Sequence, residues 1–245
     1  MSGHSKWSTI KHKKAKTDAQ RGKIFTKLVR EIVIAAKVGG ADPEGNPRLK
    51  LAIQKARQAN MPSDNIKRAV QKGAGNDDDS NLEEVLFEGY APFGVAILVE
   101  TLTDNRNRTV PNLRSIFTKF GGSLGAKGSV AYLFNKQGIV LFEPGVSEES
   151  VMDVATEAGA DDIDTKADGS IEVLTAPEQL LTVKQAFDDQ KLVYANAELM
   201  MIPTTSVALD LEQSQKIAAL IEKLEDDDDV QNVYTNADLS EDFFS

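Results

Sequence analysis

The sequence predicts a multidomain α+β protein, in which an N-terminal three-helix domain is followed by two α+β domains, one inserted in the other. The first observation is a division of charge: residues 1–75 hold 17 Lys and Arg against 5 Asp and Glu, whereas the remaining 170 residues hold 11 against 33. The second is a change of hydrophobic periodicity after the charged linker at residues 76–80, from helical spacing to short strands alternating with helices. The predicted domains span residues 1–75, residues 82–135 together with 204–240, and the inserted residues 136–203.

A lysine-rich arm at residues 5–16 precedes the first predicted helix, which spans residues 17–38. The apolar residues Ile24, Leu28 and Ile32 recur at four-residue spacing, so they form one stripe of this helix. Basic residues recur on another face at spacings of four, three and seven, and they are Lys23, Lys27, Arg30 and Lys37. A polyanion would therefore meet the arm and one face of the helix.

Cap signals define two shorter helices in the same domain. Asn46 is a favourable N-cap and Pro47 suits the first helical position, so a second helix begins there. Ser63 is predicted to cap a third helix over residues 64–72, which Gly73 ends. Three short helices around one small core, basic outside, resemble many helical nucleic-acid modules in outline.

Short strands alternate with helices in the acidic part of the chain. Before residue 136 we expect strands at 84–90 and 94–102, a helix at 105–120 and a strand at 130–134. The insertion is predicted to hold a strand at 138–143, a helix at 147–158, a hairpin of 161–165 and 171–175, a helix at 177–189 and a strand at 193–202. A strand at 206–209, a helix at 211–225 and a strand at 230–235 follow. The order within the insertion is that of a ferredoxin-like fold.

One stretch of the acidic part is basic. Residues 101–136 hold six basic groups and one acid, Asp104. Arg106, Arg108 and Arg114 lie at or near the start of a predicted helix, where backbone N–H groups also favour an anion. They either form a second phosphate contact or pair with nearby acids, and both interpretations stay open.

No recognisable catalytic arrangement stands out in the sequence, although its 38 Asp and Glu leave paired-carboxylate hydrolysis open. The chain has no cysteine and only two histidines, His4 and His12, so disulfides and thiol catalysis are excluded and no metal site is expected. The glycine-rich residues 121–125 match neither the dinucleotide-binding motif nor the phosphate loop of NTPases. No apolar run approaches the roughly 18 residues that span a bilayer. We therefore expect a cytoplasmic protein that binds no cofactor, contacts no membrane and is not an enzyme.

The charge pattern predicts binding to nucleic acid through the basic groups of the arm, the first helix and the basic stretch. The predicted contacts are Lys6, Lys11, His12, Lys13, Lys14, Lys16, Arg21, Lys23, Lys27, Arg30, Lys37, Arg106, Arg108 and Arg114. The alternative is that the basic helices dock on the acidic domains of the same chain.

Several separated motifs are similar to those of the YebC/PmpR family. They are Gly3–Trp7, Lys23–Leu28, Asn46–Leu49, Asn60–Ile66, Glu88–Tyr90 and Thr103–Thr109, in collinear order along the chain. The family includes mitochondrial translational activators of cytochrome oxidase. The resemblance implies a three-domain protein without established catalytic residues. It also implies a DNA-binding transcriptional regulator, or else a ribosome-associated factor that helps translation through proline-rich stretches.

Three functions follow from these observations. The first is a non-enzymatic, DNA-binding regulator of transcription, and the second is a translation factor that binds ribosomal RNA on the ribosome. The third is an adaptor whose acidic domains recruit basic proteins. Lysines act as point charges on phosphates and no row of base-reading side chains is evident, which suits recognition of RNA by shape somewhat better. A monomer is expected.

Overall fold

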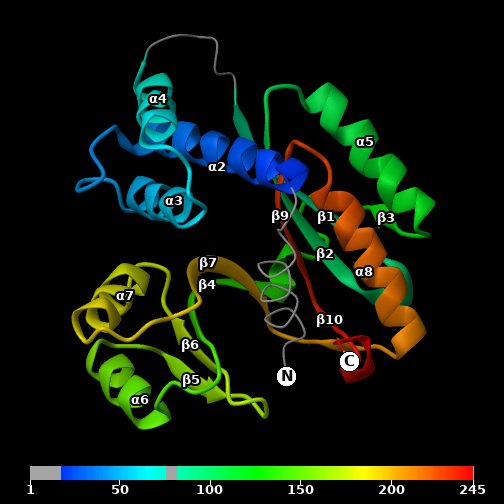
Figure 1. Ribbon diagram of the computed structural model, residues 1–245. Coiled ribbons are helices and arrows are strands. Elements are labelled where there is room, and N and C mark those ends of the chain that lie inside the picture. The colour runs from blue at the N-terminus through cyan, green and yellow to red at the C-terminus, as the bar shows by residue number, and fades with distance from the viewer. Residues whose placement is uncertain (1–17, 76–81, 245) are drawn as a thin grey trace. The chain divides into compact units, whose positions relative to one another are not determined.

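The computed structural model describes residues 18–75 and 82–244, which Figure 1 draws as coloured ribbon. Side chains are described from Gly22 onward. The chain separates into two compact units, of which one is formed by residues 134–204 and the other by the remaining described residues. The predicted fold class is confirmed, because an N-terminal helical part precedes antiparallel sheets covered by helices. The finer division into three domains at the boundaries above stays a prediction.

The N-terminal helices form what we call the helical module, built from α2 (Asp18–Gly39), α3 (Pro47–Gln58) and α4 (Ser63–Ala74). Its core is an apolar cluster that includes Ile32, Leu49 and Ile66. Asn46 caps α3 as predicted, because its side-chain oxygen accepts the Leu49 N–H at 3.1 Å.

Two details of α4 differ from prediction. Ser63 does not cap the helix: the N-cap position is taken by Pro62, which makes no side-chain cap hydrogen bond. Gly73 does not end the helix either, because it is buried inside α4, which continues to Ala74. A Cβ on Gly73 would lie 2.3 Å from the carbonyl oxygen of Val33 in α2. The glycine therefore serves close packing of α4 on α2 rather than helix termination.

The second part of the same unit is a four-stranded antiparallel sheet in the order β3-β1-β2-β9. Its strands are β1 (Glu83–Tyr90), β2 (Ala96–Thr103), β3 (Ser123–Leu124) and β9 (Val230–Thr235). Two helices, α5 (Arg106–Lys119) and α8 (Leu211–Glu225), pack on one face, where Ile97, Phe117 and Ile221 share a fully buried core. The helix predicted at 211–225 and the strand predicted at 230–235 are confirmed with those bounds.

Two short elements around this sheet differ from prediction. Most of the strand expected at 130–134 is a 3-10 turn, η2 (Ala131–Leu133), and only Phe134 belongs to a strand. The backbone N–H groups of Val130 and Ala131 donate to Glu88 instead of to a neighbouring strand. The glycine-rich residues 121–125 contain the short strand β3, which pairs with the end of β1. The strand predicted at 206–209 is present as the shorter β8 (Val207–Ala208). The remaining short elements are η1 (Pro92–Gly94), β10 (Ala237–Asp238) and η3 (Glu241–Phe244).

The unit of residues 134–204 has the ferredoxin-like order that the sequence predicts. It comprises β4 (Phe134–Phe142), α6 (Glu148–Glu157), β5 (Asp162–Thr165), β6 (Ile171–Thr175), α7 (Leu180–Asp189) and β7 (Asn196–Pro203). The strands pair antiparallel in the order β5-β6-β4-β7. Phe134, the first residue of β4, is the register partner of Pro203, the last residue of β7.

Candidate nucleic-acid interface

The predicted contacts fall into three groups in the structure. Those of the arm lie outside the described residues, and they are Lys6, Lys11, His12, Lys13, Lys14 and Lys16. Arg21 lies in α2, but its side chain is also outside the described part of the chain. Lys23, Lys27, Arg30 and Lys37 lie on α2, and Arg106, Arg108 and Arg114 lie on α5. Their role toward nucleic acid stays a prediction.

Three cations of α2 contact the chain that leads from α8 into β9, residues 225–229, which we call the acidic turn. The Lys23 ammonium lies 2.9 Å from a carboxylate oxygen of Asp226. The Lys27 ammonium donates to the carbonyl oxygen of Glu225 at 2.9 Å, at the negative C-terminal end of α8. Arg30 follows one helical turn later, so all three lie on one face of α2.

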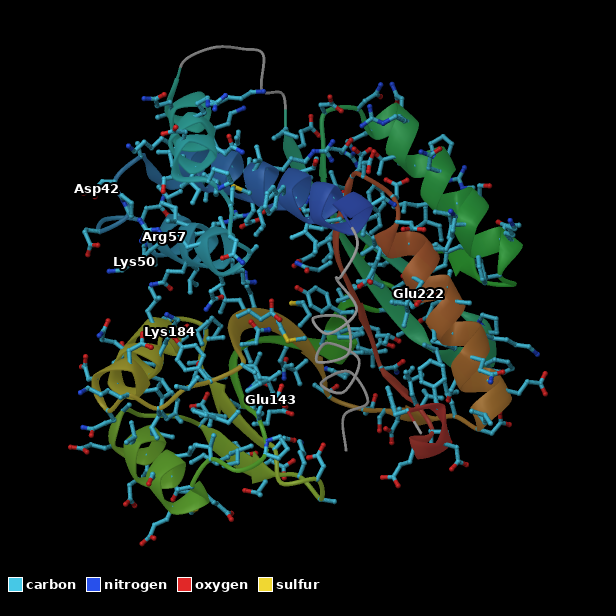
Figure 2. The ribbon with its side chains drawn as sticks, in the orientation of Figure 1. Asp42, Lys50, Arg57, Glu143, Lys184 and Glu222 are labelled. Atoms are coloured by element: carbon cyan, nitrogen blue, oxygen red, sulfur yellow. The ribbon has the colours of Figure 1, made fainter. Side chains whose placement is uncertain are left out.

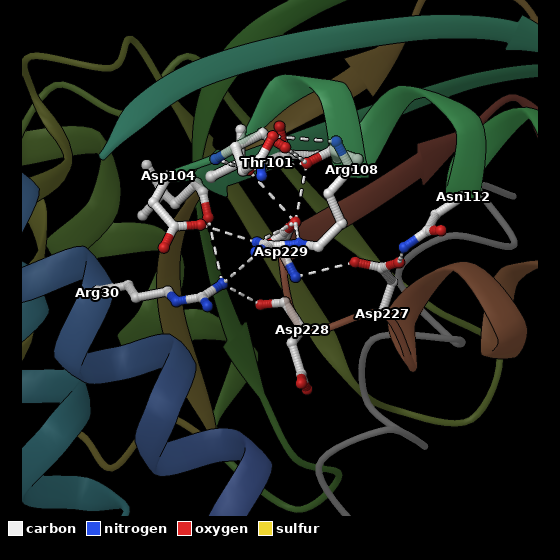
Figure 3. Close-up of polar contacts among 12 residues, drawn as sticks. Arg30, Thr101, Asp104, Arg108, Asn112, Asp227, Asp228 and Asp229 are labelled. Carbon is white, nitrogen blue, oxygen red and sulfur yellow. Dashed lines mark hydrogen bonds and ion pairs between the residues drawn. The ribbon is translucent and has the colours of Figure 1, made fainter. Parts of the chain in front are cut away.

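Asp229 is the centre of a polar network at the start of β9 (Figure 3). Its side chain is only 2% exposed and accepts hydrogen bonds from Arg108 at 2.7 and 2.8 Å, and from Arg30 at 3.2 Å. The Thr109 hydroxyl donates to the same carboxylate at 2.8 Å. Arg108 also pairs with Asp104 at 2.8 Å. One buried carboxylate therefore joins α2 of the helical module to α5 beside the sheet.

Burial alone would raise the pKa of Asp229, but the hydrogen bonds from Arg108 and Thr109 and the charges of Arg108 and Arg30 lower that pKa below its ordinary value. A lowered pKa means that the carboxylate stabilises the fold above the pKa of the unfolded chain, and that this stability is lost as pH falls through the folded-state pKa. The same network raises the pKa of the Arg108 guanidinium, chiefly through its hydrogen bond with Asp229.

We therefore expect the free energy of unfolding to fall as the pH drops below about 4, the ordinary range of aspartate. Asp229→Asn should be less stable at neutral pH but should lose stability less steeply in acid, because the titrating group is gone. Urea denaturation followed by circular dichroism across this range measures both slopes. Asp228→Asn is the matched control, since the Asp228 side chain makes none of these hydrogen bonds. Equal slopes for Asp229→Asn and wild type would contradict the prediction.

The glycine-rich loop beside β3 binds a carboxylate of its own chain. Glu88 accepts hydrogen bonds from the backbone N–H groups of Gly128, Val130 and Ala131, the latter two at 2.8 Å. Burial would raise the pKa of Glu88, but these three donors lower it below the usual value. Glu88 therefore occupies these three backbone N–H groups, which are not free to bind another anion.

Other basic side chains are exposed and form no hydrogen bond or ion pair with the described residues. On the helical module they are Arg57, Lys67 and Lys72, and on α5 they are Arg106, Arg114 and Lys119. Figure 2 labels Arg57 at the end of α3. Arg68 is also exposed, although its guanidinium donates to the Asp64 carbonyl oxygen at 3.3 Å.

The α3 and α4 cations were not among the predicted contacts. The signal that could have found them is the apolar stripe of α4, where Ile66, Ala69 and Gly73 are buried at spacings of three and four. Most residues on the other faces of α4 are exposed to water, and Lys67, Arg68 and Lys72 are among them.

Comparison with known proteins decides the family. A profile for the TACO1/YebC protein N-terminal domain matches residues 5–76, and a profile for the TACO1/YebC second and third domain matches residues 82–237. The chain belongs to the TACO1/YebC family. The resemblance seen in the separated motifs is thus confirmed.

Relatives in the TACO1/YebC family are similar over nearly the whole chain. A "probable transcriptional regulatory protein" from Proteus mirabilis is 53% identical over 98% of this chain and 96% of its own length. Proteins with the same description from Francisella tularensis and Hahella chejuensis are each 56% identical, over 98% of this chain and 97% and 96% of theirs. A conserved hypothetical protein from Aquifex aeolicus, solved as a crystal structure, has a TM-score of 0.84 and 46% identity, over 93% of this chain and 94% of that chain.

The described residues bring together no group of three or more His, Asp or Glu side chains suited to a metal ion. No helix within residues 18–75 and 82–244 is long and apolar enough to cross a membrane.

Proposed function

We propose that this TACO1/YebC protein is a cytoplasmic, non-enzymatic regulator of gene expression that binds nucleic acid. The observation that carries the proposal is the set of exposed Lys and Arg side chains on α3, α4 and α5 that have no acidic partner among the described residues. Such groups release counterions when they meet phosphates, which is the main source of affinity for nucleic acid. The arm of residues 5–16 adds lysines to the same end of the chain.

Duplex DNA is the first target to test, because the curated relatives are described as probable transcriptional regulatory proteins. The cations of α4 would contact phosphates, which position a protein on nucleic acid without reading its sequence. We therefore expect affinity that depends strongly on salt and weakly on sequence.

Removing two of these charges should lower the salt dependence of binding. For Lys67→Gln combined with Lys72→Gln, we expect the slope of log K against log salt on a DNA duplex to become shallower by about 1.8, since each phosphate contact contributes about 0.9. Fluorescence anisotropy with a labelled duplex, repeated at several salt concentrations, measures this slope.

The matched control removes two exposed lysines elsewhere, Lys191→Gln with Lys216→Gln. These should lower affinity slightly through net charge but leave the slope close to that of wild type. If the α4 variant keeps the wild-type slope, α4 does not contact phosphate. If wild type binds neither a DNA duplex nor a folded RNA, the proposed function is wrong.

A ribosome-associated translation factor is the second candidate. It is favoured by the composition of the exposed surface of α4, where Lys67, Arg68 and Lys72 supply charge but no row of base-reading amides. Sedimentation of cell lysate through a gradient, before and after nuclease and high salt, separates the two candidates. Migration with ribosomal subunits that nuclease abolishes supports translation. A protein that stays at the top at low salt, yet retains a promoter fragment, supports transcription.

A further inference from the structure

The helical module and the sheet have separate cores. The apolar cluster of the module and that of the sheet share no residue. By contrast, the contacts between α2 and the acidic turn are hydrogen bonds and ion pairs. Polar contacts between parts with independent cores are typical of interfaces that open and close.

The acidic turn presents to α2 the same chemistry that a phosphate backbone would present. Lys23 meets a carboxylate, Lys27 meets the carbonyl at the negative end of α8, and Arg30 meets the Asp228 carbonyl as well as the Asp229 carboxylate. These three cations are also among those that the sequence predicts to bind nucleic acid. In the structure their donors are directed at oxygens of their own chain.

We propose that the acidic turn occupies a phosphate-binding face of α2, formed by Lys23, Lys27 and Arg30, and that nucleic acid reaches this face by displacing the turn. The inference rests on the proposed function, because it concerns the regulation of nucleic-acid binding. It adds a closed state in which part of the basic surface is masked by the chain's own acids.

The network is built so that opening leaves no buried charge unpaired. When Arg30 departs, Asp229 keeps its three hydrogen bonds from Arg108 and those from the Thr109 and Thr103 hydroxyls. The Lys23–Asp226 pair costs little to separate, since the two side chains are 48% and 57% exposed and surface pairs are weak. Phosphates that replace the acidic turn would give the α2 cations equivalent partners.

Neutralising the acid that holds Lys23 should expose the α2 face. We expect Asp226→Asn to bind a labelled DNA duplex or folded RNA about twofold to fivefold more tightly than Asp228→Asn, as the release of one exposed ion pair allows. Asp228→Asn is matched in charge and lies two residues away, and its exposed side chain forms no hydrogen bond or ion pair with the described part of α2. The Asp228→Asn variant corrects for the increase in affinity for nucleic acid that the loss of any one negative charge would cause.

The comparison is repeated in a Lys23→Gln background, in which the advantage of Asp226→Asn over Asp228→Asn should vanish. Such a loss of coupling shows that the effect passes through the Lys23–Asp226 contact. Equal affinity of Asp226→Asn and Asp228→Asn in the wild-type background would overturn the inference.

A second experiment cross-links α2 to the acidic turn. Because the chain has no native cysteine, only the two introduced cysteines react. Lys23→Cys with Asp226→Cys is joined by a short bismaleimide, and the same variant capped with two N-ethylmaleimide groups is the control. The joined protein should bind nucleic acid several-fold more weakly than the capped one. Equal binding would mean that the closed form is competent, and would overturn displacement. If even wild type binds no nucleic acid, the proposed function fails first and the inference with it.

Discussion

Asp229→Ala is expected to lower the free energy of unfolding by about 3 kcal/mol, the lower end of the range for breaking a buried ion pair. The Asp229 side chain is 2% exposed, whereas Arg108 is 45% exposed and keeps some water, which moderates the loss. The substitution also leaves the buried Thr109 hydroxyl without its carboxylate acceptor. Urea denaturation at neutral pH measures the change.

The control is Asp228→Ala, which removes the neighbouring exposed carboxylate and should change stability by less than about 0.5 kcal/mol. The two residues are adjacent in sequence, but Asp229 is buried and pairs with Arg30 and Arg108, whereas Asp228 is exposed. A loss of stability in Asp229→Ala no larger than in Asp228→Ala would show that the Asp229 network does not stabilise the fold.

Gly73→Ala is expected to destabilise the helical module by about 2 kcal/mol or more, because it overpacks a close helix–helix contact. The added Cβ would lie 2.3 Å from the Val33 carbonyl oxygen and 2.8 Å from the Ala36 Cβ. One of these neighbours is backbone, so α4 must move away from α2 as a whole. Loss of helical signal at lower urea concentration than in wild type measures the effect.

Gly22→Ala provides the same chemical change in the same module without the clash. A Cβ on Gly22 would meet no atom within 4 Å, so alanine should stabilise α2 by up to about 1 kcal/mol through helix propensity. If Gly73→Ala and Gly22→Ala both stabilise or both destabilise the protein, the explanation that close packing of α4 on α2 requires glycine at position 73 is wrong.

Elements that depend on local signals could be predicted from the sequence. Helix α8 begins where Asp210 and Gln213 form a capping box, and both ends agree with the prediction. Strand β3 escaped prediction because two residues carry no periodicity, and they become a strand by pairing with Gly89 and Tyr90. Gly73 was misinterpreted for a similar reason, since a glycine in close helix packing and one at a helix end look alike in sequence.

In the candidate site, too, contacts between residues distant in sequence could not be predicted. The sequence identifies Lys23, Arg30 and Arg108 as basic, but the acids of the acidic turn with which they pair lie from 121 to 203 residues further along the chain. No local pattern reports such pairs. Lys23 and Arg30 pair as expected if the basic helices dock on acids of the same chain, and Arg108 pairs as expected if the basic stretch contacts nearby acids. The exposed cations of α4 were not among the predicted contacts.

Because Phe134 pairs with Pro203, residues 134–204 could be removed from the chain without separating the two ends that they leave behind. Opposed residues of antiparallel strands have Cα atoms about 5 Å apart, so the chain leaves for the insertion and returns from it at nearly the same point. A short glycine-containing linker could therefore join residue 133 to residue 205 without stretching either end. The rest of the fold could in this way be made without the insertion, and the insertion exchanged between relatives, with few changes at the two junctions.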